Sequence, residues 1–266
     1  MSACARDGSR NDKHAHLSKM VRNGTTGRRR MNIAIILSGG TGTRLGGDIP
    51  KQYTVTGGRS MIARAMEPFF WHARIDAVQI VADSAYHGKI REDVEDLTRF
   101  RGFSAPGETR ALSILNALRD IASFASDDDI VIIHDAARPF VSPEQISDLI
   151  DACREHDGAL PVLPMKDTVY LLPESTQAGI ELLDRSRIVA GQAPEAFRFG
   201  KYLAANEALL PDRIKTINGS TEPALLAGMD IVTIPGDEKN LKVTTKEDLA
   251  RYIRILDERK TCVMPA

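Results

Sequence analysis

The sequence predicts an α/β fold in which helices cover both faces of a mostly parallel β-sheet and a β-arm projects from that sheet. Short apolar runs alternate along the chain with stretches whose apolar residues recur at helical spacing, which is typical of βαβ units. The apolar runs are continuous, as expected for strands that are buried on both faces. Residues 165–190 interrupt this pattern with two β-like segments joined by a polar turn, and this segment is the predicted arm.

The first half of the folded part is expected to contain three strands and three amphipathic helices. Leu112, Leu115 and Leu118 illustrate the helical spacing, because they fall on one face of the third helix. In chain order these elements are a strand over 33–37, a helix over 60–71, a strand over 77–82, helices over 89–100 and 108–121, and a strand over 130–133. The loops after the first and last of these strands are expected to face each other across one crevice, since ligands bind beyond the carboxyl ends of parallel strands.

The second half is expected to begin with a helix, because Ser142 and Pro143 form a typical start with a serine N-cap and a proline at the first helical position. A strand precedes the arm, and the α/β pattern resumes after it. In chain order these elements are a strand over 159–163, arm strands over 168–172 and 179–183, a helix over 199–210, a strand over 231–234, and a helix over 246–256 that Thr245 caps.

Composition and charge argue against several classes of protein. The chain has 266 residues, of which 42% are hydrophobic and 27% charged, as in ordinary soluble globular proteins. Lys and Arg together number 35 against 36 for Asp and Glu, so no global charge favours nucleic acid or an anionic membrane. No apolar run approaches the length of a membrane helix. Three scattered cysteines without a CxxC pair predict neither a disulfide framework nor a zinc site, and a reducing cytoplasm is expected.

The chain is expected to have three parts. Residues 1–30 are rich in Arg, Lys, Ser, Gly and Asn and contain no apolar stretch of the kind found in secretory signals. We therefore expect a disordered basic N-terminal extension there, with a basic arm that contacts nucleic acid as the alternative. Residues 31–258 are expected to form the folded domain, and residues 259–266 a C-terminal tail.

A glycine-rich loop directly after the first strand is the first candidate site. Glycines let backbone N–H groups curl around phosphate oxygens, and Arg44 and Lys51 add charges that can neutralise a triphosphate. The dinucleotide pattern GxGxxG fails because Leu45 stands where its third glycine is required, and the P-loop pattern fails at Asp48. We expect the loop to bind phosphate, with a plain tight turn as the alternative.

Polar clusters elsewhere supply further candidates. Asp135 follows the third strand and offers the hard oxygen ligand that Mg²⁺ prefers, with helix capping or pairing with Arg138 as the alternative. His134 is expected to be structural. The other clusters are Gly107-Glu108-Thr109-Arg110 with Ser113, Lys166-Asp167-Thr168 with Asp184-Arg185, and residues 240–244. For each of these, an ordinary helix cap, charged hairpin or exposed strand is the structural alternative.

Taken together, these segments resemble the cytidylyltransferases that act on 2-C-methyl-D-erythritol 4-phosphate and on ribitol 5-phosphate. The resemblance runs from about residue 31 to 258 and rests on GGTGTRL followed by PKQY, and on GETRALS, HDAARP, KDT, DR and NLKVTT. It implies a Rossmann-like, three-layer nucleotidyltransferase fold whose arm builds a homodimer. It also implies a cytoplasmic enzyme that uses Mg²⁺ to transfer CMP from CTP to a polyol phosphate and releases pyrophosphate.

The resemblance implies a role for each matching residue. The implied catalytic residues are Arg44, Lys51, Arg185 and Lys242. The implied CTP-binding residues are Ser38, Gly39, Gly40, Thr41, Gly42, Thr43, Gly107, Glu108, Ser113 and Ala136. The implied acceptor-binding residues are Thr168, Arg185 and Thr221, of which the arm would carry the first two toward the partner subunit's site. Asp135 is the implied ligand of Mg²⁺.

The chain departs from the family's pattern on the acceptor and metal side. An Ala-Pro-Glu run at 193–195 stands where many members carry Thr-Pro-Gln, and Thr-Glu at 221–222 where many carry Thr-Asp. Lys239 replaces a residue that is often acidic, which leaves Asp237 and Glu238 as candidates for a second metal ligand. The KDT and HDAARP segments look more like the methylerythritol phosphate branch, with ribitol 5-phosphate as the alternative acceptor.

Three other functions compete with this interpretation. A sugar-1-phosphate uridylyl or thymidylyl enzyme would share the glycine-rich loop, but the HDAARP and GETRALS segments disfavour it. A catalytically silent nucleotide-binding homologue would share the fold, since fold does not imply function. An oxidoreductase is disfavoured by the failed GxGxxG pattern.

Overall fold

The computed structural model describes residues 28–40, 49–94, 98–173 and 179–263. The chain divides into two units between Arg30 and Met31, and the second unit contains all the secondary structure described below. None of the helices in the described ranges is long and apolar enough to cross a membrane.

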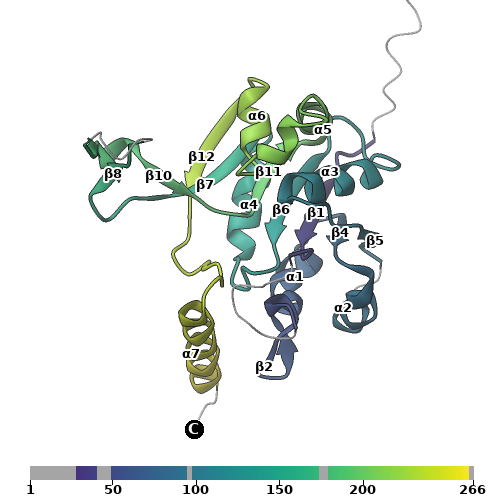
Figure 1. The fold of residues 1–266 in the computed structure, drawn as a ribbon. Helices are drawn as coiled ribbons and strands as arrows, with labels where there is room; N and C mark the ends of the chain where they lie inside the picture. Colours follow the sequence, from purple (N-terminus) through teal and green to yellow (C-terminus); the bar gives the residue numbers. More distant parts are fainter. Residues whose placement is uncertain (1–27, 41–48, 95–97, 174–178, 264–266) are drawn as a thin grey trace, which may run out of the picture. The chain divides into compact units, whose positions relative to one another are not determined.

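Eight strands form the main sheet (Figure 1). They are β1 (Asn32–Leu37), β4 (Ala77–Val81), β5 (Phe100–Ser104), β6 (Ile130–Asp135), β7 (Gly158–Pro164), β10 (Val189–Gly191), β11 (Glu195–Arg198) and β12 (Ile231–Pro235). The spatial order runs from β5 through β4, β1, β6 and β11 to β7, which also pairs with β10 and β12. The pairs among β1, β4, β5 and β6 are parallel, as is the β7–β12 pair, whereas β10 and β11 run antiparallel to their neighbours.

Helices cover both faces of this sheet because its strands present apolar side chains to both faces. One face packs Ala34 and Ile36 of β1 against α1 (Met61–Trp71), α2 (His87–Asp93) and α4 (Pro143–Ala152). The other face packs Ile33 and Ile35 against α3 (Arg110–Ile121), α5 (Phe199–Glu207) and α6 (Glu222–Leu226). The predicted fold class, a three-layer Rossmann-like arrangement with a mostly parallel sheet, is therefore confirmed.

The remaining elements lie outside the main sheet. A small hairpin joins β2 (Val55–Thr56) to β3 (Arg59–Ser60), 3₁₀ turns span Lys51–Tyr53, Ser84–Tyr86, Arg185–Arg187 and Arg213–Thr216, and α7 (Lys246–Val263) closes the chain. The helix α7 packs through Tyr252 and Leu256 against Phe140 and Met61. The hydroxyl of Thr245 accepts a hydrogen bond from the backbone N–H of Asp248 at 3.1 Å, which is the cap expected from the sequence.

The arm is an isolated antiparallel pair of strands, β8 (Val169–Leu171) and β9 (Glu181–Leu183), which stands apart from the main sheet at the left of Figure 1. Its apolar side chains face solvent in the single chain: Leu172 is 75% exposed, Leu182 65% and Ile180 63%. A lone two-stranded hairpin is marginally stable in water. The arm therefore presents an apolar surface that lacks a covering layer within the described residues of one chain.

The structure differs from the expected elements at the helix predicted over 89–100 and at β11. The helix expected over 89–100 ends at Asp93, and Phe100 instead begins the edge strand β5. The reason lies in tertiary packing, since Phe103 of β5 stacks on His87 with the ring centroids 3.7 Å apart. The strand β11 was not expected at all, because its first residue is the polar Glu195, which is nevertheless buried.

Candidate active site

A cavity of about 460 Å³ opens at the carboxyl ends of β1 and β6. The loops that follow these two strands meet there, because the backbone N–H of Ala136 donates to the carbonyl of Leu37 at 3.0 Å. The predicted crevice is thus present. The described residues that line it are Leu37, Ser38, Gly39, Gly40, Lys51, Gln52, Gly107, Glu108, Thr109, Arg110, Ser113, Asp135, Ala136, Ala137 and Lys242.

The start of the glycine-rich loop is shaped by the turn that follows it. The side-chain amide of Gln52 donates to the carbonyls of Ser38 and Gly40 at 2.9 and 2.7 Å, and the hydroxyl of Tyr53 lies 3.0 Å from that of Ser38. Gln52 and Tyr53 are both buried. In the sequence, only their place beside Lys51 pointed to these two residues, and their supporting role was not predicted.

Two glycines are required by close approach at this site. A Cβ on Gly39 would lie 2.5 Å from the Cβ of Pro106, so the glycine-rich loop and the segment before α3 touch at this point. A Cβ on Gly107 would lie 2.5 Å from the Cβ of Leu112 and 2.9 Å from the backbone nitrogen of Ser113. The absence of a side chain at Gly107 therefore serves the tight entry into α3.

Ser113 stabilises the same entry. Its hydroxyl accepts a hydrogen bond from the backbone N–H of Gly107 at 3.0 Å and donates to the carbonyl of Thr109 at 2.9 Å. Thr109 is the N-cap of α3 and accepts from the N–H of Leu112. A hydroxyl has one proton and two lone pairs, so Ser113 keeps a single acceptor position for a ligand in the cavity.

Asp135 is the last residue of β6 and lies in a cluster of cations. Its Oδ1 accepts from Nη2 and Nε of Arg110 at 3.0 and 3.2 Å, and its Oδ2 lies 2.8 Å from Nζ of Lys242. The pairing with Arg138 that was weighed from the sequence is present but long, at 3.9 Å. Burial alone would raise the pKa of Asp135, but the charges of Arg110 and Lys242 lower it far below its usual range. Asp135 is therefore an anion at neutral pH.

Lys242 reaches this cluster because the segment before α7 runs beside the loop after β6. The backbone N–H of Val243 donates to the carbonyl of Ala137 at 2.9 Å, and Nη1 of Arg138 donates to the carbonyl of Asn240 at 2.8 Å. These bonds fix the direction in which Lys242 enters the cavity. In the sequence, only the family resemblance assigned Lys242 to the site.

His134 lies beneath the cluster and is fully buried. Its Nε2 is 3.0 Å from the carbonyl oxygen of Arg138, and since a carbonyl can only accept, Nε2 carries the proton. Burial lowers the pKa of His134 to about 4. A neutral imidazole that is committed to the backbone fits the structural role expected from the sequence.

A polar network behind Arg110 was not anticipated. Nη1 of Arg110 donates to Oγ of Ser220 at 2.8 Å, and Oγ1 of Thr221 donates to Oε2 of Glu195 at 3.0 Å. Glu195 belongs to the Ala-Pro-Glu run at which the chain departs from its family. The signals for this network were the arginine in GETR and that departure, but only the fold brings them together.

The arm residues and Thr221 do not line the cavity in the single chain. Nη1 of Arg185 donates to the carbonyl of Lys166 at 2.8 Å, and Thr168 is exposed on the same arm. Thr221 is buried behind Arg110. Four predicted residues of the glycine-rich loop lie outside the described residues, and they are Thr41, Gly42, Thr43 and Arg44.

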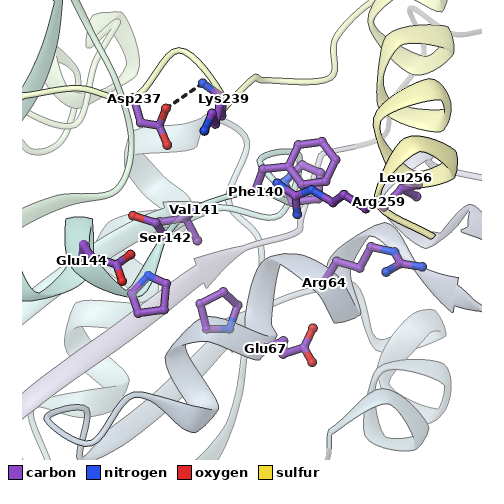
Figure 2. Close-up of a pocket in the computed structure, with 13 residues that line it drawn as sticks. Arg64, Glu67, Phe140, Val141, Ser142, Glu144, Asp237, Lys239, Leu256 and Arg259 are labelled. Carbon is purple, nitrogen blue, oxygen red and sulfur yellow. Dashed lines mark hydrogen bonds between the residues drawn. The ribbon is translucent and has the colours of Figure 1, made fainter. Parts of the chain in front are cut away.

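A second, larger cavity of about 1000 Å³ lies elsewhere on the domain, between α1, the start of α4 and α7 (Figure 2). Figure 2 shows Asp237 on its wall, bonded to the backbone N–H of Lys239 at 2.8 Å. Glu238 forms an ion pair with Lys166 at 2.5 Å. Asp237 and Glu238 do not line the cavity that contains Asp135. Neither residue is therefore positioned to act as a second metal ligand there.

The first cavity thus combines glycine-rich backbone, lysines, an arginine and one clamped carboxylate at the carboxyl end of a mostly parallel sheet. These features are typical of α/β proteins that bind nucleotides. The family model described as "IspD: 2-C-methyl-D-erythritol 4-phosphate cytidylyltransferase" matches residues 32–258, and the chain belongs to this family.

Relatives and solved structures agree with this membership. The chain is 38% identical over 218 residues to the "Bifunctional enzyme IspD/IspF" of Rhodopseudomonas palustris, with 82% of this chain and 53% of that protein covered. It spans about half the length of such bifunctional relatives. It is 33% identical to the "2-C-methyl-D-erythritol 4-phosphate cytidylyltransferase" of Geobacter metallireducens, with 85% of this chain and 98% of that protein covered.

The fold is likewise similar to solved structures. A crystal structure of 4-diphosphocytidyl-2C-methyl-D-erythritol synthase has a TM-score of 0.71 at 25% identity, with 86% of this chain and all of that chain covered. The synthase from Anaerococcus prevotii has a TM-score of 0.74 at 23% identity and shows the same fold, with 86% of this chain and 96% of that chain covered.

Proposed function

We propose that this protein transfers CMP from CTP to 2-C-methyl-D-erythritol 4-phosphate and releases pyrophosphate, a step in the synthesis of isoprenoid precursors. The observation that supports this proposal most strongly is the cavity in which the family's motifs come together around Asp135. Residues from five separated sequence segments line that cavity: residues 37–40, 51–52, 107–113, 135–137 and 242. An alternative acceptor, ribitol 5-phosphate, has no specific observation in its favour.

The proposed reaction needs positioning and charge more than it needs a base. The phosphate of the acceptor is already ionised near neutral pH, so its oxygen can attack the α-phosphorus of CTP in line as pyrophosphate leaves. Lys51 and Lys242 would stabilise the negative charge that develops on the phosphoryl oxygens. His134 is neutral and turned to the backbone, which agrees with a reaction that uses no histidine base.

The residues present also fit a magnesium ion. Within the described residues no three His, Cys, Asp or Glu side chains gather to hold a metal. Mg²⁺ is usually held by one or two carboxylates together with substrate phosphates, so the ionised Asp135 at the cavity wall is a sufficient protein ligand. Bound there, the ion would neutralise charge on the triphosphate.

We further propose that the active protein is a homodimer joined through the arm. The exposed side chains of Leu172, Ile180 and Leu182 make this hairpin a poor structure for a lone chain in water. The arm would also place Thr168 and Arg185 against the phosphate of the acceptor in the partner subunit's site. Their absence from the cavity of their own chain agrees with this arrangement.

Pyrophosphate release from CTP tests the proposal directly. The protein is incubated with CTP, Mg²⁺ and either 2-C-methyl-D-erythritol 4-phosphate or ribitol 5-phosphate, and release is compared with reactions that contain UTP or no acceptor. We expect release with CTP and the methylerythritol phosphate alone. Release with ribitol 5-phosphate instead would reassign the acceptor, and failure to bind CTP would refute a cytidylyltransferase.

A further inference from the structure

Glu195 is a buried carboxylate that the transfer reaction described above does not use. It begins β11, and its partner in the sheet is Ile133 of β6, two residues before Asp135. Side chains at paired positions, and at alternate positions along a strand, lie on the same face of a sheet. Glu195 and Asp135 therefore lie on the same face, with Arg110 at the start of α3 on that side.

The hydrogen bonds around Glu195 have a defined direction. Oγ of Ser220 accepts from Nη1 of Arg110 at 2.8 Å. Oγ1 of the next residue, Thr221, donates to Oε2 of Glu195 at 3.0 Å. Glu195 therefore holds Thr221, whose neighbour in the chain, Ser220, supports the guanidinium that clamps Asp135.

The electrostatic surroundings agree with this description. Burial raises the pKa of Glu195, and the two hydroxyls and the positive charge of Arg110 act against that rise. The contacts run from Glu195 through the adjacent residues Thr221 and Ser220 to Arg110, and from there to Asp135. Asp135 lines the cavity beside Lys242.

We propose that Glu195 is a positioning residue, which acts through Ser220 to orient Arg110 and so holds Asp135 in place for the reaction. This inference rests on the proposed transfer reaction. The proposed role requires acceptor oxygens at position 195 more than it requires a negative charge there. Gln at this position keeps one acceptor oxygen, whereas Leu keeps a similar volume and offers none.

Steady-state kinetics of two variants test this requirement. We expect Glu195→Leu to lower kcat/KM for the acceptor by about 10–100-fold, as is usual when a supporting partner of a site residue is removed. We expect Glu195→Gln to stay within about fivefold of wild type, because the amide oxygen of Gln can still accept from Thr221. The dissociation constant of CTP, measured by calorimetry without acceptor, should change less than about twofold in both variants, since neither substitution replaces a cavity-lining residue and Asp135 keeps its ion pair with Lys242.

The matched control is Glu207→Leu. Glu207 of α5 pairs with Arg119 at 3.1 Å, and Arg119 lies on the same helix α3 as Arg110. The same substitution therefore removes a carboxylate from an arginine of α3, at a half-exposed position with a different arginine partner. Its kcat/KM should equal that of wild type within about twofold.

A double variant separates a positioning role of Glu195 from a purely stabilising one. In Ser220→Ala the connection to Arg110 is already cut, so adding Glu195→Leu should cost less than about twofold in kcat/KM. The inference is overturned if Glu195→Leu costs the same factor in both backgrounds, if it keeps wild-type kcat/KM, or if the affinity for CTP falls in parallel with turnover.

An equilibrium measurement keeps the test independent of the reaction. The decrease in Tm of the double variant Glu195→Leu with Arg110→Ala should be smaller than the sum of the two single decreases, because the two residues act as one unit. Additive decreases would overturn the inference. Absence of pyrophosphate release from the wild-type protein would instead refute the proposed function, and the Tm measurement would still decide whether Glu195 orients Arg110.

Discussion

Replacement of Asp135 by Asn should destabilise the protein in a way that the geometry of the site defines. The amide oxygen can take the place of Oδ1 and accept from Arg110, but the amide nitrogen then faces Nζ of Lys242, which lies 2.8 Å from Oδ2 in the wild-type protein. Two donors would meet at hydrogen-bond distance. Hydrogen bonds to charged groups contribute about 1.5–3 kcal/mol to stability, and the side chains of Lys242 and Arg110 are 41% and 31% exposed.

We therefore expect a loss of about 2 kcal/mol in the free energy of unfolding, near the lower end of that range because solvent screens both cations. For a domain of this size such a loss lowers Tm by about 4–8 °C. Thermal unfolding followed by circular dichroism at pH 7 with a metal chelator measures it. The chelator ensures that the difference reports on Arg110 and Lys242 alone.

The stability difference between wild type and Asp135→Asn should depend on pH in a definite direction. The pKa of Asp135 is lower in the folded protein than in the unfolded chain, so its stabilising contribution is complete above the unfolded pKa of about 3.9 and is lost as the pH falls toward the folded value. The stability difference between wild type and Asp135→Asn should therefore shrink by about 1 kcal/mol between pH 7 and pH 3. Equal Tm values at pH 7, or a difference that grows toward pH 3, would refute the argument.

Three further predictions concern the proposed reaction and the dimer. Lys51→Ala should abolish pyrophosphate release while the circular dichroism spectrum stays that of wild type; near-normal turnover would remove Lys51 from the phosphate site. Arg185→Ala should raise the KM of the acceptor at least tenfold more than that of CTP, and an equal rise in both would mean that the arm does not bind the acceptor. Leu182→Asp should convert a dimer to a monomer in analytical ultracentrifugation, because a charge would replace an apolar contact, whereas a dimer that persists would place the interface elsewhere.

The sequence was sufficient where local pattern decides structure. Residues 33–37 form a continuous apolar run and lie in β1, and Ser142 caps α4 through a hydrogen bond that its type and place predict. The arm was predictable because its two β segments and polar turn are neighbours in the chain. Local pattern failed at β11, whose polar first residue is buried and accepts a hydrogen bond from Thr221, a contact that comes from a distant part of the chain.

Several residues that line the cavity could be named from the sequence, but their pairings could not. Motif segments named Asp135 and Lys242, and the structure places both on the wall of one cavity. The clamp of Arg110 on Asp135 and the support of Gln52 for the glycine-rich loop arise from contacts across the fold. Such contacts depend on the spacing of strands and helices in three dimensions, and no periodicity along one chain encodes them.

The position of Lys242 has a consequence for how the protein is made. Ribosomes synthesise the chain from its N-terminus, so β1, α3 and β6 emerge before residue 242 and can pack before it is translated. Asp135 and Arg110 then meet while Lys242, which follows β7, β11 and β12 in the sequence, is still missing. A polypeptide that is cut or stalled before this lysine could keep most of the sheet and still lack a complete site. The cluster of charges around Asp135 is thus completed only after β7, β11 and β12 have been translated.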